Sequence, residues 1–291
     1  MFTRPPLRLG ETVWDWSRPY LLGIVNVTPD SFSDGGLAFT TESAVAHALR
    51  LVAEGADALD LGGESTRPDA RPVSADEELA RVIPVIEALR GRVSVPLSID
   101  TTKAAVAEAA LSAGACVVND TGVGDDVSAL GAVAARHGAA YVAMHARGAP
   151  STMRALARYD DVVSEVRDAL LARADALSRA GGARERILLD PGLGFAKTAE
   201  HSLTLLANLG PIRALGFPLC VGASRKSFIV ADGPYPQWPR DESPPRDRVG
   251  GTAAAVALSV AQGAEVHRVH DVAVARQAAR VAHAVASRSL T

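Results

Sequence analysis

The sequence predicts a single α/β domain folded as a (β/α)8, or TIM, barrel with a short N-terminal hairpin. Apolar runs of strand length alternate with segments of helical spacing along most of the chain. The turns from helix to strand are short and contain glycine, whereas the turns from strand to helix carry most of the polar residues. This asymmetry is typical of a barrel with its functional groups at the carboxyl ends of the strands. A doubly wound open sheet is the alternative fold.

Length and composition agree with a soluble globular protein. The chain has 291 residues, 48% of them hydrophobic and 22% charged, so it can bury a large core. A net charge of −3 gives no reason to expect nucleic acid or an anionic membrane as a partner. The start of the chain is too polar for a signal peptide, and no apolar run approaches the roughly 18 residues of a membrane span. The two cysteines, Cys116 and Cys220, each stand in an apolar run and are expected to be buried and reduced. These cysteines and the lack of a signal peptide or membrane span predict a cytoplasmic location.

The elements follow one another regularly. Residues 1–18 form an N-terminal extension in which 6–18 alternate loosely and predict a hairpin, and residues 19–291 form the barrel. The expected strands are Leu21–Val27, Ala58–Leu61, Val95–Ile99, Cys116–Val118, Ala140–Met144, Ile187–Leu189, Pro218–Val221 and Val266–Val269. The expected helices are 41–54, 74–90, 103–113, 126–137, 158–180, 198–215, 247–262 and 271–288.

Local signals support these boundaries. Ser74 with Glu77 three residues later predicts a capping box at one helix start. Glycines that follow the helical patterns are expected at C′ positions; they are Gly55, Gly114, Gly138, Gly181 and Gly263. Residues 230–248 contain five prolines and many polar groups, which predicts a long exposed loop without regular structure.

One turn organises the predicted site. The apolar run that ends at Val221 opens at Gly222 into two hydroxyl residues and two adjacent cations, Ser224 to Ser227, followed by a predicted helix start. A helix N-terminus with cationic side chains suits an anionic or carbonyl-bearing ligand. Lys226 is also one of only three lysines in an arginine-rich chain, with Lys103 and Lys197, which hints that a compact donor is required there.

Polar residues end several other strands. Asp100, Asn119 and Asp190 each follow a buried apolar run, so we expect them to converge with Lys226 on one pocket. Carboxylate and amide acceptors beside one ammonium donor match a planar heterocycle with an amino-pyrimidinone edge. His145 also ends a strand, but spacing identifies no partner for it.

A second set of residues predicts an anion site at the rim. Arg268 and His270 are two apart on the last strand, so both are expected on the same side. Arg67, in the loop after the second barrel strand, is a bidentate donor suited to phosphate. Asn26 ends the first strand, where its amide oxygen suits a hard cation such as Mg2+.

With these residues named, the chain resembles dihydropteroate synthase, the folate-pathway enzyme that sulfonamides inhibit. The resemblance rests on several stretches in the family's order: 23–36, 60–68, 98–101, 119–120, 189–195, 222–227 and 268–272. It implies a barrel that is usually a homodimer. It also implies the condensation of 6-hydroxymethyl-7,8-dihydropterin pyrophosphate with p-aminobenzoate, which gives 7,8-dihydropteroate and pyrophosphate.

The resemblance also implies roles for single residues. Asp100, Asn119, Asp190 and Lys226 would hold the pterin, and the four residues expected in catalysis are Asp100, Lys226, Arg67 and His270. Asn26, Arg67, Arg268 and His270 would hold the pyrophosphate with Mg2+, for which Asn26 is the metal ligand. The p-aminobenzoate side would be formed by Phe32, Thr66, Arg67, Pro68, Phe195 and Ser227. The implied mechanism is dissociative, with a pterin-methyl cation that Asp100 stabilises.

The chain departs from the family pattern at two places. Asp69 stands where glycine is usual, and Val230 replaces another glycine ahead of a long 231–248 loop. These departures bear on substrate affinity and sulfonamide response. One alternative is a catalytically inactive paralogue that binds pterin without forming pteroate. Another is a corrinoid-dependent pterin methyltransferase, which would not need the Thr66-Arg67-Pro68 loop or the Ser224–Ser227 turn.

Overall fold

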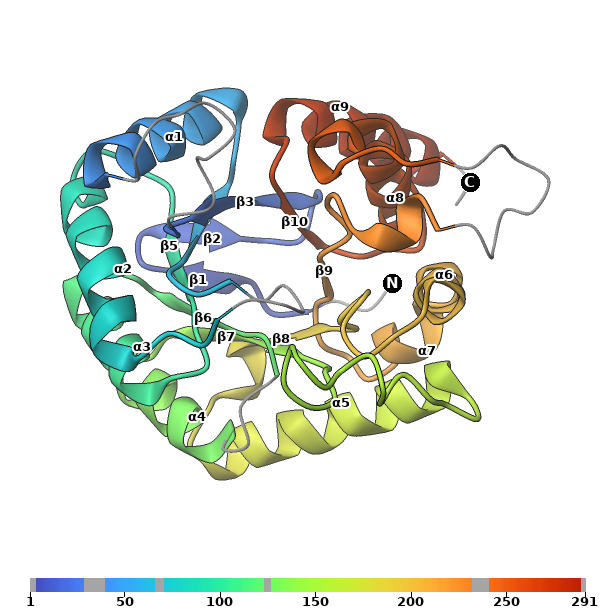
Figure 1. Ribbon diagram of the computed structural model, residues 1–291, viewed down its shortest axis with the longest axis horizontal. Coiled ribbons are helices and arrows are strands. Elements are labelled where there is room, and N and C mark those ends of the chain that lie inside the picture. The colour runs from blue at the N-terminus through green and yellow to red at the C-terminus, as the bar shows by residue number, and fades with distance from the viewer. Residues whose placement is uncertain (1–3, 29–39, 66–70, 123–126, 232–240, 289–291) are drawn as a thin grey trace.

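Eight parallel strands close into a barrel with helices around it in the computed structural model of the protein (Figure 1). The structure describes residues 4–28, 40–65, 71–122, 127–231 and 241–288. The strands pair in the order β8-β7-β6-β5-β4-β3-β10-β9, and a bridge between Leu189 and Leu219 joins the two ends of this series. The closure confirms the predicted barrel and excludes the open sheet.

The barrel strands lie at or within two residues of the predicted ones. They are β3 (Tyr20–Asn26), β4 (Ala58–Gly62), β5 (Leu97–Asp100), β6 (Val117–Asp120), β7 (Ala140–Met144), β8 (Ile187–Asp190), β9 (Cys220–Val221) and β10 (Val266–Val269). The helices are α1 (Thr41–Glu54), α2 (Ala75–Leu89), α3 (Ala104–Ala113), α4 (Val127–Arg136), α5 (Val162–Arg179), α6 (Ala199–Ala207), α7 (Gly210–Arg213), α8 (Val249–Ala261) and α9 (Val272–Ala286). None of the helices in the described ranges is long and apolar enough to cross a membrane.

Two local expectations are wrong. The helix predicted over 198–215 is divided into α6 and α7, because Pro211 has no N–H and its ring would clash with the carbonyl of Ala207 in a continuous helix. The capping box at α2 is only half formed. Ser74 Oγ accepts a hydrogen bond from the Glu77 N–H at 3.2 Å, but the Glu77 carboxylate pairs with Arg71 and Arg81 instead.

The N-terminal hairpin covers the amino end of the barrel. Its strands β1 (Leu7–Leu9) and β2 (Thr12–Trp14) are antiparallel and cross the middle of the ring in Figure 1. Leu7, Leu9 and Trp14 form one hydrophobic cluster with inward-facing strand residues such as Leu188 and Val266. This end of the barrel interior is therefore filled with apolar side chains.

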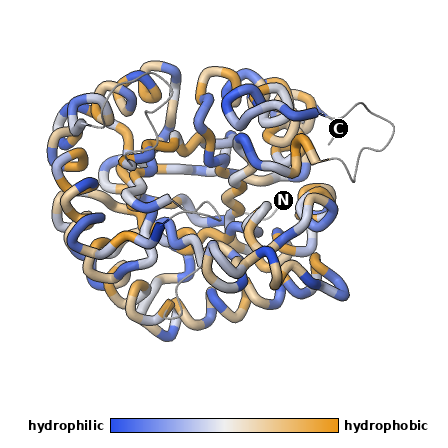
Figure 2. Tube along the Cα trace, in the orientation of Figure 1, coloured by the Kyte–Doolittle hydropathy of each residue, from blue (hydrophilic) through white to orange (hydrophobic). Residues whose placement is uncertain are grey.

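A second and larger hydrophobic cluster lies between the strands and the surrounding helices. The helices show mixed hydropathy along their length, as expected when one face packs on a sheet and the other meets solvent (Figure 2). Strand residues alternate between the two clusters: on β8, Leu188 faces inward and Leu189 faces the helices. The same alternation turns Asp190 inward at the carboxyl end.

Candidate active site at the carboxyl end of the barrel

Three of the residues predicted to converge face the barrel interior where their strands end. Asp100 closes β5, Asn119 lies on β6 and Asp190 closes β8. Asp100 and Asn119 are direct partners in the parallel register of β5 and β6. Asn119 and Asp190 are 5% and 4% exposed. Because β-strand side chains alternate, Asp120 turns outward, where its carboxylate accepts a hydrogen bond from the Tyr141 hydroxyl at 2.6 Å and pairs with Arg173.

Asp60 lies at the centre of this group. It is fully buried in the middle of β4 and accepts hydrogen bonds from Ser98 Oγ at 2.6 Å and from Asn119 Nδ2 at 2.9 Å. A third donor, Arg268 Nε, lies 2.6 Å from the same carboxylate. Sequence reasoning missed Asp60 as a site residue because it stands inside an apolar strand rather than at its end. A charged residue between Leu59 and Leu61 was the signal that would have found it.

Arg268 joins two carboxylates. In addition to its bond to Asp60, its terminal nitrogen lies 2.5 Å from Asp100 Oδ2. Arg268 thus faces the barrel interior, as the two-residue spacing on β10 predicts, but its guanidinium is engaged below the rim. A guanidinium that bridges the fully buried Asp60 and the largely buried Asp100 offsets much of the cost of removing those charges from water.

Burial changes the titration of the site carboxylates. Burial raises the pKa of Asp100 to about 7, with Arg268 opposing the rise and Asp60 adding to it. Burial also raises the pKa of Asp190, while the Lys226 ammonium acts in the opposite direction. Perturbed carboxyl groups in a polar cluster are typical of functional sites.

Lys226 lies beside Asp190 and the loop that follows β8. Its Nζ donates to the Leu193 carbonyl oxygen and lies 4.6 Å from the centre of the Phe195 ring. Burial lowers the pKa of Lys226 to about 8, and Asp190 limits that fall. Asp190 Oδ1 accepts a hydrogen bond from the Gly192 N–H at 2.7 Å. The structure therefore brings Lys226 and Phe195 together with the pterin-side residues predicted from the sequence.

A second lysine supports the same loop. Lys197 is 8% exposed, and its Nζ donates to His145 Nδ1 at 2.8 Å and to the Phe195 carbonyl oxygen at 3.0 Å. Burial lowers the pKa of Lys197 to about 7, with Lys226 adding to the fall. Gly192 is required beside it, because a Cβ there would lie 2.0 Å from the His145 carbonyl oxygen. His145, which the sequence left without a partner, thus belongs to the support of the Phe195 loop.

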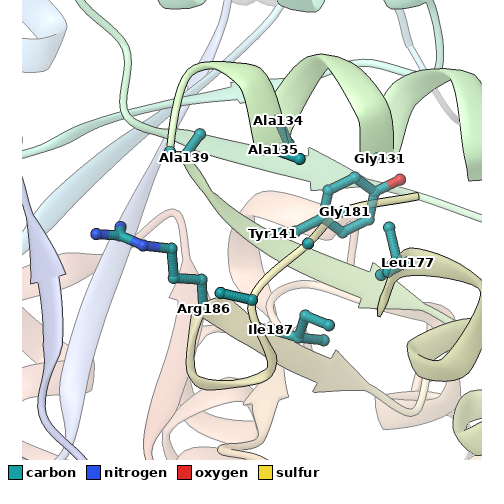
Figure 3. Close-up of a pocket in the computed structure, with 12 residues that line it drawn as sticks. Gly131, Ala134, Ala135, Ala139, Tyr141, Leu177, Gly181, Arg186 and Ile187 are labelled. Carbon is teal, nitrogen blue, oxygen red and sulfur yellow. The ribbon is translucent and has the colours of Figure 1, made fainter. Parts of the chain in front are cut away.

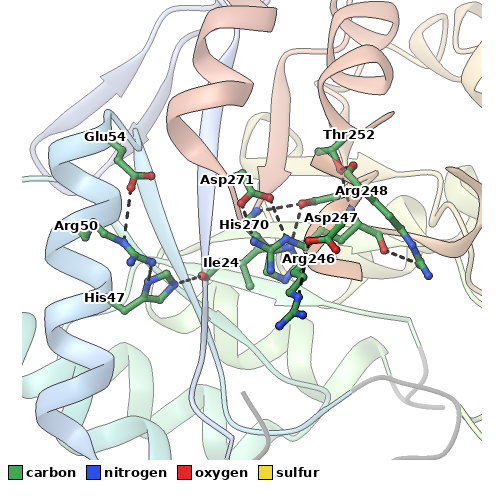
Figure 4. Close-up of polar contacts among 12 residues, drawn as sticks. Ile24, His47, Arg50, Glu54, Arg246, Asp247, Arg248, Thr252, His270 and Asp271 are labelled. Atoms are coloured by element: carbon green, nitrogen blue, oxygen red, sulfur yellow. Dashed lines mark hydrogen bonds and ion pairs between the residues drawn. The ribbon is translucent and has the colours of Figure 1, made fainter. Parts of the chain in front are cut away.

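The loops after β9 and β10 are tied to each other. The His270 N–H donates to Ser224 Oγ at 3.1 Å, and that hydroxyl lies 3.0 Å from His270 Nδ1. Arg225, which has a φ of 60°, forms a two-point ion pair with Asp271 at 2.9 and 2.6 Å. Figure 4 shows His270 and Asp271 beside Arg248 and Thr252 in this region. These bonds fix the rim on which His270 lies, next to the Lys226 turn.

The remaining predicted site residues lie at the barrel mouth or outside the described residues. Asn26 ends β3, is half-buried, and has its backbone paired to Gly62 at the barrel mouth. Ser227 does not begin a long helix: the segment after Lys226 is a single 3₁₀ turn, Ser227–Ile229, so the expected helix N-terminus is absent there. The loop predicted over 230–248 contains one further 3₁₀ turn, Pro245–Asp247, in its described part. Phe32, Thr66, Arg67, Pro68 and Asp69 lie outside the described residues.

Two hollows lie away from this site. One, of about 100 Å³, is lined by small residues of α4 and of the segments that follow α4 and α5, with Leu177, Tyr141 and Arg186, near the amino ends of β7 and β8 (Figure 3). The other, of about 420 Å³, is outside the barrel, where Arg147, Arg173 and three alanines of α5 line it. Both arginines are already paired with acidic side chains, Glu165 and Asp120. Neither hollow contains the inward-facing polar residues.

Comparison with known proteins gives one family. The sequence model described as "Pterin binding enzyme" matches residues 22–270. A dihydropteroate synthase of Synechocystis is 47% identical over 97% of this chain and 95% of its own length, and that of Escherichia coli K12 is 42% identical over 95% of each. The chain belongs to the dihydropteroate synthase family of pterin-binding enzymes.

Solved structures of relatives extend the similarity to the whole fold. The Xanthomonas albilineans dihydropteroate synthase with 4-aminobenzoic acid has a TM-score of 0.87 at 44% identity, covering 97% of this chain and 98% of that one. The same enzyme in complex with 7,8-dihydropteroate has a TM-score of 0.84 at 42% identity, with the same coverage. A Yersinia pestis enzyme in a sulfonamide complex has a TM-score of 0.88 at 40% identity, covering 97% of this chain and all of that one.

The unusual environment of Lys197 leads to a prediction about stability. Its folded pKa of about 7 lies below the ordinary value of 10.5, so the unfolded chain holds the proton that the folded chain releases between these limits. The free energy of unfolding should therefore gain up to about 1.4 kcal/mol per pH unit from this group as the pH rises through that range. Lys197→Met should remove this gain, measured by urea unfolding at about pH 7.5 and 9.5. An unchanged pH dependence in the variant would contradict the assignment.

Proposed function

We propose that the protein is a dihydropteroate synthase of folate biosynthesis. It condenses 6-hydroxymethyl-7,8-dihydropterin pyrophosphate with p-aminobenzoate and forms 7,8-dihydropteroate and pyrophosphate. The observation that carries this proposal is a polar cluster inside a barrel of the dihydropteroate synthase family: Asp60, Asn119 and Asp190 are buried in it, and Asp100 and Lys226 are partly buried. Relatives solved with 4-aminobenzoic acid and with 7,8-dihydropteroate support the two substrates.

The pterin lies among the inward-facing polar groups. The amino-pyrimidinone edge of a pterin offers several N–H donors and one carbonyl acceptor. Asp100, Asn119 and Asp190 supply acceptor oxygens, and the ammonium of Lys226 supplies the donor for the carbonyl. Because Asn119 and Asp190 are buried and Asp100 and Lys226 are partly buried, each unmatched group would cost free energy, and this favours a ligand with that donor pattern.

The pyrophosphate lies toward the rim. We assign it to His270, Arg268, Asn26 and Arg67, of which Arg268 lies on β10 and His270 directly follows that strand. His270 is held in place by Ser224, and Arg268 must exchange at least one carboxylate contact before it meets an anion. The assignment of Arg67 rests on the sequence motif alone.

A Mg2+ ion fits this arrangement only together with the substrate. Asn26 offers one amide oxygen, and no group of three or more acidic, histidine or cysteine side chains suited to a metal occurs in the described part of the chain. Mg2+ commonly keeps several waters and binds substrate phosphates rather than an all-protein cage. We assign Asn26 as the protein ligand of a Mg2+ ion that accompanies the pyrophosphate. The ion would neutralise charge on the leaving group.

The p-aminobenzoate lies on the Phe195 side. Phe195 and Ser227 flank Lys226 in the structure, and Phe32, Thr66, Arg67 and Pro68 are assigned to this side by motif. The 3₁₀ turn at Ser227 leaves the carboxylate of this substrate to the Ser227 hydroxyl and to Arg67. A sulfonamide, as a mimic of p-aminobenzoate, is expected to compete here.

The chemistry follows from charge. The C–O bond to the pyrophosphate breaks, and the electron pair leaves with the pyrophosphate, which the cationic rim stabilises. The pterin-methyl cation that remains is stabilised by the Asp100 carboxylate, and the arylamine nitrogen then forms the new C–N bond and releases a proton. No side chain of the protein has to act as a covalent nucleophile.

The direct test is pyrophosphate release by the purified protein with the dihydropterin pyrophosphate and Mg2+. Release and dihydropteroate formation should both require p-aminobenzoate, and a sulfonamide should inhibit in competition with it. Lys226→Ala should lower kcat/KM at least about 100-fold, because a charged donor to the pterin is lost. Arg167→Ala, on the exposed face of α5, is the control that should retain activity. Pterin binding without product would identify an inactive paralogue instead.

The pH dependence of kcat/KM provides a second prediction. Activity should rise as Asp100 loses its proton near pH 7 and fall as Lys226 loses its proton near pH 8, which gives a narrow bell. Lys226→Arg should move or remove the alkaline limb, because a guanidinium keeps its proton. A flat profile from about pH 6 to 9 would exclude these two groups as the ones that titrate.

We also propose a homodimer formed through α8 and α9. Exposed large apolar residues gather on these two helices, which pack against each other: Leu258 is 57% exposed, Val281 66% and Val285 59%. Apolar residues grouped at the surface mark interaction sites.

Analytical ultracentrifugation tests this assembly. The protein should sediment as a dimer at about 10 μM, and Val281→Glu should convert it to a monomer, since a buried unpaired charge at an interface costs several kcal/mol. Val13→Glu is the matched control, because Val13 lies on the hairpin, away from α8 and α9, and is 42% exposed. This variant should remain a dimer. A monomeric parent protein would exclude the proposal.

A further inference from the structure

Asp60 has a property that distinguishes it from the other carboxylates of the cluster: all three of its side-chain hydrogen bonds are accepted from polar groups of the site wall. It is fully buried, and the donors are Ser98 Oγ, Asn119 Nδ2 and Arg268 Nε. Asp60 also lies two residues before the end of its strand: its register partner is Ser98, whereas Asp100, at the end of β5, pairs with Gly62. It therefore lies beneath the pocket rather than on its surface.

The charge of Asp60 decides how Asn119 is oriented. An amide side chain has one acceptor end and one donor end, and either end can turn toward a ligand. A carboxylate only accepts hydrogen bonds, so the Nδ2 end of Asn119 must face Asp60. The Oδ1 end is then directed away from Asp60, toward the other residues of the cluster.

The same contact orders the rest of the cluster. Arg268 Nε is held by the oxygen of Asp60 that also accepts from Asn119, and the far end of the guanidinium holds Asp100 Oδ2. Asp190 uses Oδ1 for the Gly192 N–H. Asn119, Asp100 and Asp190 thus each have one polar atom engaged within the protein, which leaves one oxygen of each side chain for a ligand.

We infer that Asp60 is a positioning residue that sets the ligand specificity of the site. Its carboxylate fixes Asn119 with the amide oxygen toward the pocket and fixes Arg268 against Asp100, so that the pocket wall presents acceptors to a donor-rich pterin edge. This inference rests on the proposed function and assigns a role to a residue that contacts no substrate.

Asp60→Asn is the sharpest variant because it keeps the shape and removes only the charge. Three donors converge on Asp60, and an asparagine would direct its own N–H2 at one or more of them. Either Ser98 loses its acceptor, or Asn119 and Arg268 lose theirs. Ser98→Ala is the matched control, since it removes one donor from the same carboxylate but leaves its charge and its contacts with Asn119 and Arg268 in place.

The test measures the affinity for 6-hydroxymethylpterin, a pterin without pyrophosphate, by calorimetry. Asp60→Asn should bind at least about 30-fold more weakly and Ser98→Ala less than about 5-fold more weakly than the parent protein. If Asp60 acts through Asn119, the loss caused by Asp60→Asn should shrink to about 3-fold or less in an Asn119→Ala background. A folded Asp60→Asn protein with parental affinity, or losses that multiply fully in the double variant, would overturn the inference.

A second measurement needs no variant and decides the matter if Asp60→Asn fails to fold. In the parent protein, the side-chain N–H2 of Asn119 should exchange with solvent at least about 100-fold more slowly than that of the exposed Asn208, as measured by NMR. This slow exchange should persist when the pterin is bound, because the N–H2 group faces Asp60. Exchange at the rate of Asn208 would overturn the inference.

The outcomes separate this inference from the proposed function. A protein that binds the pterin and forms no dihydropteroate removes the synthase proposal but leaves the Asp60 test intact. Product formation with an unaffected Asp60→Asn variant removes the role of Asp60 and leaves the synthase proposal. A parent protein that does not bind the pterin overturns both.

Discussion

The site depends on the largely buried contact of one guanidinium with two carboxylates, Arg268 with Asp60 and Asp100. Buried charges are tolerated only when they are paired and hydrogen-bonded, and these three satisfy that condition from three different strands. The group still carries one more negative charge than positive when Asp100 is ionised. That excess gives the pocket a negative character, which suits a donor-rich heterocycle and a cationic reaction intermediate better than an anion. The proposed pyrophosphate site therefore requires that Arg268 exchange a carboxylate contact for the anion, next to His270 at the rim.

The rest of the barrel isolates this group from water on its lower side. The hairpin places Leu7, Leu9 and Trp14 against the inward-facing residues of the amino end. The polar layer consequently lies on an apolar floor, and the low effective dielectric there strengthens both the ion pairs and the cost of any unmatched polar atom. The raised pKa of Asp100, to about 7, is a consequence of the same burial. The fold thus supplies the environment, and the strand ends supply the groups.

Sequence reasoning located most of what depends on local pattern. The alternation of apolar strands and helices predicted the closed barrel, and strand ends predicted the inward position of Asp100, Asn119 and Asp190. It missed Asp60 because residues within apolar runs were taken as core, and it placed Arg268 at the rim because contacts between β10, β4 and β5 are not visible in spacing. The roles of Arg67 and Phe32 stay predictions from motif, since these residues lie outside the described ranges.

The shape of the lysine side chain explains why lysine, and not arginine, stands at three positions of the carboxyl end. Lys226 and Lys197 each bind carbonyl oxygens of the loop after β8, and Lys103 bridges Glu64 at 2.5 Å and the fully buried Glu78 at 2.6 Å. All three therefore lie around the carboxyl end of the barrel. An ammonium places three donors around one small atom and fits among converging oxygens, whereas a planar guanidinium needs a flat, two-point partner. Arg268 is suited to its place because it bridges two carboxylates, Asp60 and Asp100. The lysines are suited to theirs because several oxygen atoms converge on one nitrogen.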